Sequence, residues 1–150
     1  MSAISLARLL ERAPAGVFML ASDVTRKRVS DLCKARNLYF YFADCHGVTS
    51  KEALLQTLAR DLQLPEHFGG NWDALADCLM DMDKVRTDGL VMMLSGLDDF
   101  ARQQPDEYET LSAILSDAAV YWAEEPAPFY VLLGGDAEVL GADLTRVTAL

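Results

Sequence analysis

The sequence is poor in the residues from which metal sites, disulfide scaffolds and nucleotide sites are built. Two histidines and three cysteines occur among 150 residues, and Cys33, Cys45 and Cys78 show no Cys-x-x-Cys spacing. His46 beside Cys45 is the only place where a thiol and an imidazole adjoin, and no third ligand follows at a metal-binding spacing. The phosphate-binding P-loop and Gly-x-Gly-x-x-Gly patterns are also absent. We therefore expect neither a cofactor nor a metal ion.

A long apolar run is missing as well. Residues 1–10 include Ile4, Leu6 and Leu9, but Arg8 interrupts them and no signal-peptide core or cleavage site follows. We expect no targeting segment, no membrane span and no membrane partner. The odd number of cysteines favours buried reduced thiols, Cys78 among them, and hence a reducing cytoplasm. With 51% apolar residues, the chain is long enough for one domain with a substantial core.

Basic side chains are scarce in most of the chain. The formal net charge is −10, but residues 1–37 hold seven Lys or Arg against three acids, whereas the remainder holds six against twenty. Between Asp61 and Asp83 there are six acids and no base. Such a field repels nucleic acid and attracts a basic protein, whose association it accelerates in a salt-dependent way. The charge thus predicts a basic protein partner and no direct nucleic-acid binding.

Strand-like and helix-like patterns alternate along the chain and predict the α/β class. Compact apolar runs indicate strands, and a period of about 3.6 residues indicates amphipathic helices. The expected order is a helix at 2–12, a strand at 16–21, a helix at 23–36, a strand at 38–43, a helix from Thr49 or Ser50 to Leu62, a helix after Asn71, a strand at 90–94, a loop or helical turn at 98–104, a helix from Pro105 to about Glu124 and a strand at 129–133. Strand–helix–strand order favours parallel strands with right-handed crossovers. The aromatic run 38–43 is continuous, as in a strand covered on both faces.

Residues 64–83 carry the most unusual pattern, a loop followed by a short helix with one acidic face. The core-facing residues of this helix are Trp72, Leu75, Cys78, Leu79 and Met82. Asp73, Asp77 and Asp81 fall on the opposite face, one helical turn apart. Like charges four residues apart destabilise a helix by roughly 0.2–0.5 kcal/mol per pair. This face is therefore expected to serve a partner rather than the fold; a merely solvated face is the alternative.

The stretch LPEHFGGNWDALADCL within this segment resembles the barstar family of intracellular ribonuclease inhibitors. The shared motif is Leu-Pro, an aromatic-Gly turn, and Asn-aromatic-Asp-Ala-Leu-x-Asp-Cys-Leu, and the order of the flanking elements agrees from about residue 37 to 134. The resemblance implies a barstar-like fold of two or three layers, with helices on a parallel sheet of three to four strands. Residues 1–150 would form a single domain, in which a strand–helix extension, 1–36, precedes the family core and a tail, 135–150, follows it.

The resemblance also implies a function. Members of this family insert acidic side chains of the second family helix, with a neighbouring loop, into the cationic active site of a secreted ribonuclease, where RNA phosphates would otherwise lie. By resemblance Asp77 is the central carboxylate, Asp73 is the one a turn earlier, and His67 stands where an aromatic ring stacks on the nuclease. The other expected partner-binding residues are Gly69, Gly70, Ala76, Met80, Asp81 and Asp117. We expect a cytoplasmic inhibitor that forms a 1:1 complex with a basic ribonuclease and catalyses nothing.

Several alternatives stay open at this point. Ala76 and Met82 stand at positions where the founding inhibitor has aromatic residues, so the partner of this chain can be another basic protein, bound by a non-inhibitory interaction or immunity module. The alternative for His67 is packing within its loop, and the alternative for Asp117 is a solvated side chain. A further alternative is a metal-dependent hydrolase in which Asp73 and Asp77 hold a Mg²⁺ ion. The absence of Lys and Arg near these acids in the sequence argues against it, because no basic side chain would hold a substrate phosphate.

Overall fold

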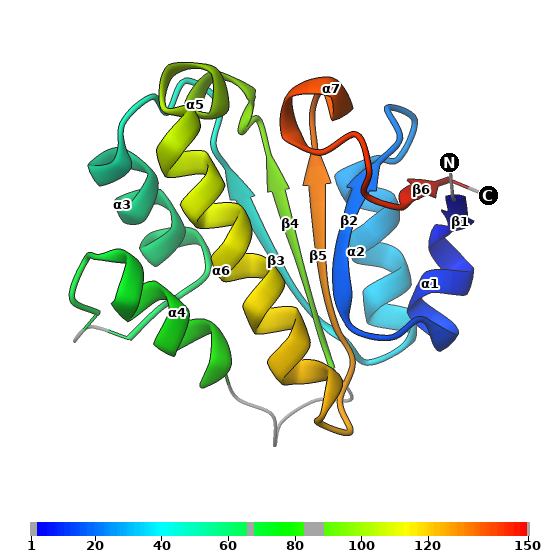
Figure 1. Ribbon diagram of the computed structural model, residues 1–150. Helices are drawn as coiled ribbons and strands as arrows, with labels where there is room; N and C mark the ends of the chain where they lie inside the picture. Colours follow the sequence, from blue (N-terminus) through cyan, green and yellow to red (C-terminus); the bar gives the residue numbers. More distant parts are fainter. Residues whose placement is uncertain (1–2, 66–67, 83–88, 150) are drawn as a thin grey trace.

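A six-stranded parallel sheet forms the centre of the molecule. The computed structural model describes residues 3–65, 68–82 and 89–149 (Figure 1). The strand order is β1-β6-β2-β5-β4-β3, and every pairing is parallel. The strands are β1 (Ala3–Ser5), β2 (Gly16–Leu20), β3 (Tyr39–Asp44), β4 (Leu90–Ser95), β5 (Phe129–Gly134) and β6 (Arg146–Thr148). The α/β class and the parallel sheet are confirmed.

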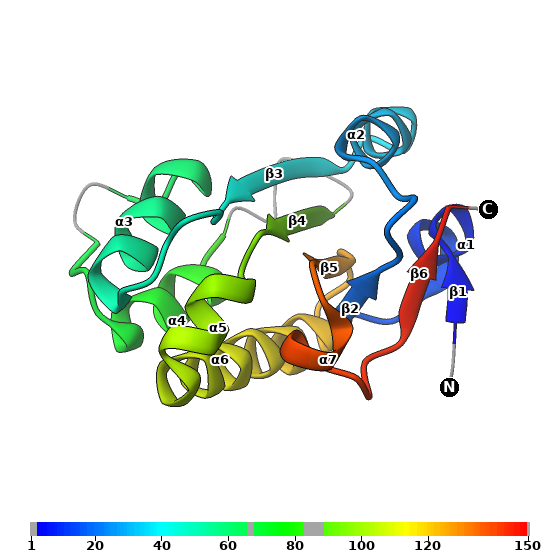
Figure 2. The same ribbon diagram turned by 90° about the horizontal axis from the view of Figure 1, so that it is seen from above.

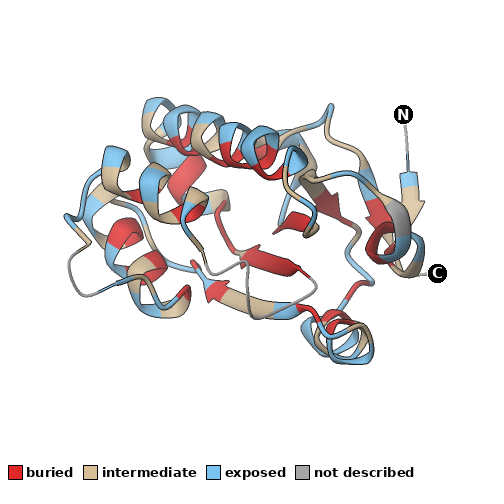
Figure 3. Ribbon diagram, turned by 90° about the horizontal axis from the view of Figure 1, so that it is seen from below, coloured by how far each residue is buried: buried red, intermediate tan, exposed pale blue. Residues whose placement is uncertain are grey.

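Helices cover both faces of the sheet, so the molecule has three layers (Figure 2). One face is covered by α1 (Leu6–Arg12) and α2 (Arg26–Ala35). On the opposite face lie α3 (Lys51–Asp61), α4 (Trp72–Met80), α5 (Asp98–Gln103), α6 (Pro105–Ala123) and α7 (Ala137–Leu140). Two hydrophobic clusters separate the layers, and the buried residues gather on the sheet and on the inward sides of the helices (Figure 3).

Local sequence explains where the main elements begin. The side chains of Thr25, Ser50 and Asn71 each accept a hydrogen bond from a backbone N–H in the first turn of α2, α3 and α4. Pro105 occupies the first turn of α6, where its missing N–H costs nothing. β4 and β5 are apolar throughout because they run through the middle of the sheet and are covered on both faces.

The aromatic strand is packed on both faces, as predicted, but it lies at one edge of the sheet, where it pairs with β4. Tyr41 and Ala43 belong to the cluster under α3 and α4, whereas Phe40 and Phe42 pack against the cluster under α2. The more exposed rings also contact one another and a cation. Tyr39 and Tyr41 stack with centroids 5.8 Å apart, and the Arg26 guanidinium lies 3.9 Å from the Phe42 ring centre. Aromatic residues with polar partners thus form an edge strand that a hydrophobic pattern alone does not distinguish from a central one.

The sheet also has two more strands than the largest number predicted. β1 was included in the helix expected at 2–12, and β6 lies in the tail that was assigned only a weak helix or an ordered extension. Each has three residues, and they pair with each other through Ala3 and Arg146, Ile4 and Val147, and Ser5 and Thr148. β6 also pairs with β2, through Leu20 and Val147. Across the described residues, no helix is both long enough and apolar enough to cross a membrane.

Candidate functional site

Helix α4 is fixed to the body of the protein at both ends. Asn71 caps its N-terminus by accepting a 2.8 Å hydrogen bond from the Ala74 N–H. The indole N–H of Trp72 donates to Glu107 of α6 at 2.6 Å, and the buried indole N–H of Trp122 donates to the Leu79 carbonyl at 2.9 Å. Trp72 is therefore half-buried and bonded at the surface of the cluster, not fully inside the core as predicted. The helix is a rigid platform for whatever its outer face presents.

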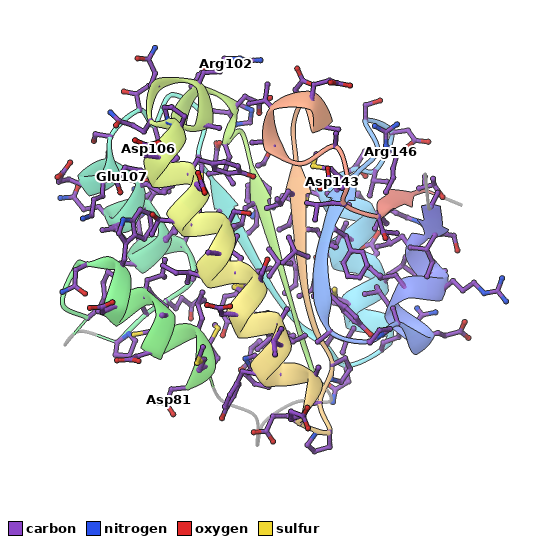
Figure 4. The ribbon with its side chains drawn as sticks, in the orientation of Figure 1. Asp81, Arg102, Asp106, Glu107, Asp143 and Arg146 are labelled. Carbon is purple, nitrogen blue, oxygen red and sulfur yellow. The ribbon has the colours of Figure 1, made fainter. Side chains whose placement is uncertain are left out.

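The outer face of α4 presents the three predicted carboxylates to solvent. Asp73, Asp77 and Asp81 are all exposed, and among the described residues none of them forms an ion pair with a basic side chain. Asp81 caps the C-terminus of the helix and extends outward there (Figure 4). We call these three residues the acidic ridge. Because no basic side chain of the described residues neutralises them, we infer that their charge is available to a partner.

A hollow of about 380 Å³ lies beside the acidic ridge, between α4 and the loop before it. Asp77 and Asp81 line it together with the mainly apolar residues Tyr41, Gln63, Leu64, Pro65, Phe68, Gly69, Ala74, Cys78 and Met82. Sequence analysis did not identify this hollow. Leu64, Pro65 and Phe68, which form part of its wall, belong to the motif noted in the sequence. The contribution of Tyr41 from β3 depends on the tertiary fold and could not be read from that motif.

The charges of the acidic ridge affect the pKa of Cys78, which lines the hollow. Burial raises the pKa of the Cys78 thiol, and the negative charges of Asp77 and Asp81 raise it further. Cys78 is only half-buried, contrary to the prediction of a buried thiol, whereas Cys33 and Cys45 are fully buried. Burial also raises the pKa of Cys33 and of Cys45 to about 12. All three thiols are free, and burial leaves Cys45 poorly suited to act with the adjacent His46 as a nucleophile.

The two glycines of the loop before α4 differ in backbone conformation. Gly70 has a φ of +69°, and a side chain there would be strained even though the space around it is open. Gly69 has no such φ, and an added Cβ would meet Asn71 Nδ2 at 3.4 Å. Both glycines are exposed. His67 lies outside the described residues.

The remaining predicted residues flank the ridge on one side. Helical spacing places Ala76 and Met80, both half-buried, on the side of α4 away from the hollow-lining Ala74 and Cys78. Asp117 is exposed on α6, which lies beside α4 (Figure 1). The structure thus brings Gly69, Asp77 and Asp81 together at the hollow, with Gly70 and Asp73 exposed nearby in the sequence. Within the described part of the chain, no group of three or more His, Cys, Asp or Glu side chains is arranged to hold a metal ion.

Comparison with solved structures shows a shared fold. The Aeropyrum pernix ORC2 protein, solved as ADPNP-ADP complexes, is 17% identical with a TM-score of 0.64; the match covers 95% of this chain and 43% of that one. Drosophila ORC bound to GC-rich DNA and Cdc6 is 8% identical with a TM-score of 0.44, covering 83% of this chain and 42% of that one. The present chain therefore spans less than half the length of these chains. At such identities the first similarity shows the fold alone.

Comparison with protein families addresses the segment that contains the acidic ridge. No curated protein matches the chain. Residues 38–134, which run from β3 through α4 to the end of β5, match the family described as Barstar (barnase inhibitor). This span is most of the chain and includes both the ridge and the hollow. The chain therefore belongs to the barstar (barnase inhibitor) family.

Proposed function

We propose that this protein is a stoichiometric inhibitor of a basic, barnase-like ribonuclease that the cell secretes, and that it acts in the cytoplasm. The observation that carries the proposal is the acidic ridge: three exposed carboxylates, unpaired among the described residues, on a rigid helix beside an apolar hollow. In a 1:1 complex the ridge would occupy the sites of RNA phosphates in the active site of the enzyme. No catalytic step and no cofactor is part of the proposal.

The binding energy would come from carboxylates that lose water and form ion pairs with basic side chains of the partner. A carboxylate at a wet surface gains little from a single ion pair, because water screens it. The same carboxylate gains much more when several Arg or Lys donors surround it and water is excluded. Asp77 is the best placed of the three residues, since it lies in the middle of the ridge and also lines the hollow. The apolar wall of the hollow would exclude water from that contact.

Barnase is the ribonuclease with which to test the proposal first. Adding increasing amounts of the protein to a fixed amount of barnase should abolish RNA cleavage at a 1:1 ratio. Asp77→Ala should weaken the inhibition by about 30-fold or more, which corresponds to about 2 kcal/mol, and Asp73→Ala by a smaller factor. Glu138→Ala on α7 removes the same charge from an exposed site away from α4 and should leave inhibition unchanged.

Salt gives a second readout of the same proposal. The association rate should fall as ionic strength rises, because the ridge attracts its partner over long range. Normal inhibition by both aspartate variants would show that the ridge is not the binding site. If barnase is not inhibited at all, a panel of other basic secreted ribonucleases decides whether the chain is a ribonuclease inhibitor.

A second candidate function is suggested by one feature of the ridge. Ala76 is small and half-buried beside the acids, so the ridge lacks a large apolar contact at that point. An interaction or immunity module for a different basic protein would keep the acids but change the residues around them. Recovery of a cationic protein other than a nuclease by the wild-type chain, and not by Asp77→Ala, would favour this function.

A further inference from the structure

A second concave site lies at the carboxyl ends of the strands, away from the acidic ridge. It is a crevice of about 500 Å³ lined by residues in the carboxyl-terminal parts of β2, β4 and β5 and in the segments that follow β2, β3, β4 and β5. The lining residues are Leu20, Ala21, Ser22, Val24, His46, Met93, Ser95, Gly96, Asp98, Gly134, Gly135 and Asp136. None of them lines the hollow beside α4. The size is within the range of about 300–1,000 Å³ that is usual for small-molecule sites.

The topology of the sheet explains why a crevice opens here. The chain leaves β2 toward α2, which packs on one face, but it leaves β4 and β5 toward α5 and α7 on the opposite face (Figure 2). β2 and β5 are neighbours in the sheet, so the connections diverge between them. In open parallel sheets, ligands bind at such a switch point outside the carboxyl ends of the strands. The crevice is therefore where the fold itself leaves room for a ligand.

The crevice has a fixed polar wall. Asp98 Oδ2 accepts a 2.7 Å hydrogen bond from the Asp136 N–H, and the Asp98 carboxylate lies so close over Gly135 that a Cβ there would not fit. The His46 ring lies against Gly96 in the same close way, and its Nδ1 is 2.6 Å from Asp44 Oδ1. The glycines thus allow the imidazole and the carboxylate to lie directly against the backbone at the ends of the strands.

The charge of this wall selects the kind of ligand. Among the described residues no Lys or Arg lines the crevice. Arg102, which does not line the crevice, lies 3.7 Å from Asp136 and 4.0 Å from Asp99. Asp98 is half-buried, and among the described residues it accepts a hydrogen bond from a neutral backbone N–H and forms no ion pair. A phosphate or carboxylate group would be repelled here, whereas a cation would supply the charge that the half-buried carboxylate lacks.

We propose that this crevice binds a small organic cation, a primary amine on a short apolar skeleton. Its ammonium group would donate hydrogen bonds to Asp98 and to the Ser95 hydroxyl. Its carbon skeleton would lie against the apolar wall formed by Leu20 and Met93. This site is separate from the proposed inhibitory surface and does not depend on it.

Three probes with nearly the same skeleton and different charge test the proposal: isoamylamine, isoamyl alcohol and isovalerate. Binding to the full chain is followed by NMR, using the His46 ring and the Gly96 and Gly135 amides as reporters. The amine should shift these signals saturably, the alcohol should bind at least tenfold more weakly, and isovalerate should not bind. Equal binding of amine and alcohol would overturn the proposed selectivity for a cation.

Variants test the position of the ligand. Asp98→Asn keeps a carbonyl oxygen to accept from the Asp136 N–H and should weaken amine binding at least tenfold. Gly134→Val should abolish it, because a Cβ at Gly134 meets only ordinary contacts at 3.7 Å or more and would extend into the crevice. Asp73→Asn on α4 is the control and should leave binding unchanged. The proposal is wrong if both crevice variants bind like wild type, or if the amine shifts the α4 amides as strongly as those of Gly96 and Gly135.

Discussion

Asp77 is a residue that the fold does not need. It lies in the second half of α4, where the helix dipole gives a negative charge no benefit, and it is four residues from both Asp73 and Asp81. Its side chain is exposed and has no cationic partner among the described residues. The residue therefore weakens the helix slightly in the free protein, and a bound partner would compensate for that cost.

Replacing Asp77 by alanine should make the free protein more stable. Relief of like-charge repulsion and the better helix propensity of alanine should together raise the free energy of unfolding by about 0.5–1 kcal/mol. Urea unfolding measures this directly, with Glu138→Ala as the control for a change in net charge. A loss of more than about 1 kcal/mol would mean that Asp77 has a structural role, and its effect on inhibition would then need another explanation.

At the scale of elements, two tryptophans decide where α4 sits. Trp122 is buried in α6, stacks on Phe129 with ring centroids 5.3 Å apart, and donates to the Leu79 carbonyl. Trp72 is half-buried and bonds to Glu107 at the surface. Water can therefore replace the exposed hydrogen bond of Trp72 more easily than the buried one of Trp122. We infer that the Trp122 bond contributes more to holding the C-terminal end of α4 than the Trp72 bond contributes at the N-terminal end.

Replacing each tryptophan by phenylalanine should show that difference. Trp122→Phe leaves the buried Leu79 carbonyl without its donor and should cost about 1–3 kcal/mol of the free energy of unfolding, beyond the loss of ring volume. Trp72→Phe should cost about 1 kcal/mol or less, because solvent can reach Glu107. Urea unfolding of the two variants provides the measurement. Equal costs would show that the buried hydrogen bond does not hold α4.

At the scale of the whole molecule, two buried thiols and a buried phenol should make the protein less stable at alkaline pH. Burial raises the pKa of Cys33, Cys45 and Tyr108 to about 12, so these groups stay protonated in the native state well above pH 9. In the unfolded chain the thiols lose their protons near pH 9. The native state then binds more protons than the unfolded state, and stability falls as pH rises between about 9 and 12.

The expected slope is on the order of 1 kcal/mol per pH unit for each buried thiol above pH 9. Urea unfolding at a series of alkaline pH values measures it. A double variant, Cys33→Ala with Cys45→Ala, should be less stable at neutral pH because of the space it leaves, yet its stability should fall less steeply with pH. An unchanged slope in the double variant would exclude the thiols as the cause.

The sequence predicted best those features that depend on neighbouring residues in the chain. The apolar runs of β4 and β5, the start of α4 after Asn71 and Pro105 at the start of α6 were all predicted, and helical period alone placed Asp73, Asp77 and Asp81 on an outer face. It failed where an element depends on a distant partner. β1 and β6 have three residues each, too few for a pattern, and they form by pairing with distant segments, β1 with β6 and β6 with β2. The hollow likewise requires Tyr41 from β3 beside α4.

The N-terminal strand β1 depends on the C-terminal strand β6 for its place in the sheet. Among the strands of the described residues, β1 pairs with β6 alone, and Val147 is buried in the same cluster as Leu6 and Leu9 of α1. Deleting residues 145–150 should therefore release β1, loosen α1 and lower the melting temperature by several degrees. Limited proteolysis should then cut first near the N-terminus. A truncated chain with an unchanged melting temperature and cleavage pattern would contradict this dependence.

The pairing of β1 with β6 also places the two ends of the chain at one corner of the sheet (Figure 1). A short peptide could bridge Ala3 and Ala149 and close the chain into a ring. The ring could be reopened at Gly47, an exposed turn residue whose missing side chain would meet nothing within 4 Å. Such a circular permutant would start just ahead of α3 and should still display Asp73, Asp77 and Asp81, because their arrangement depends on packing and not on which residue comes first.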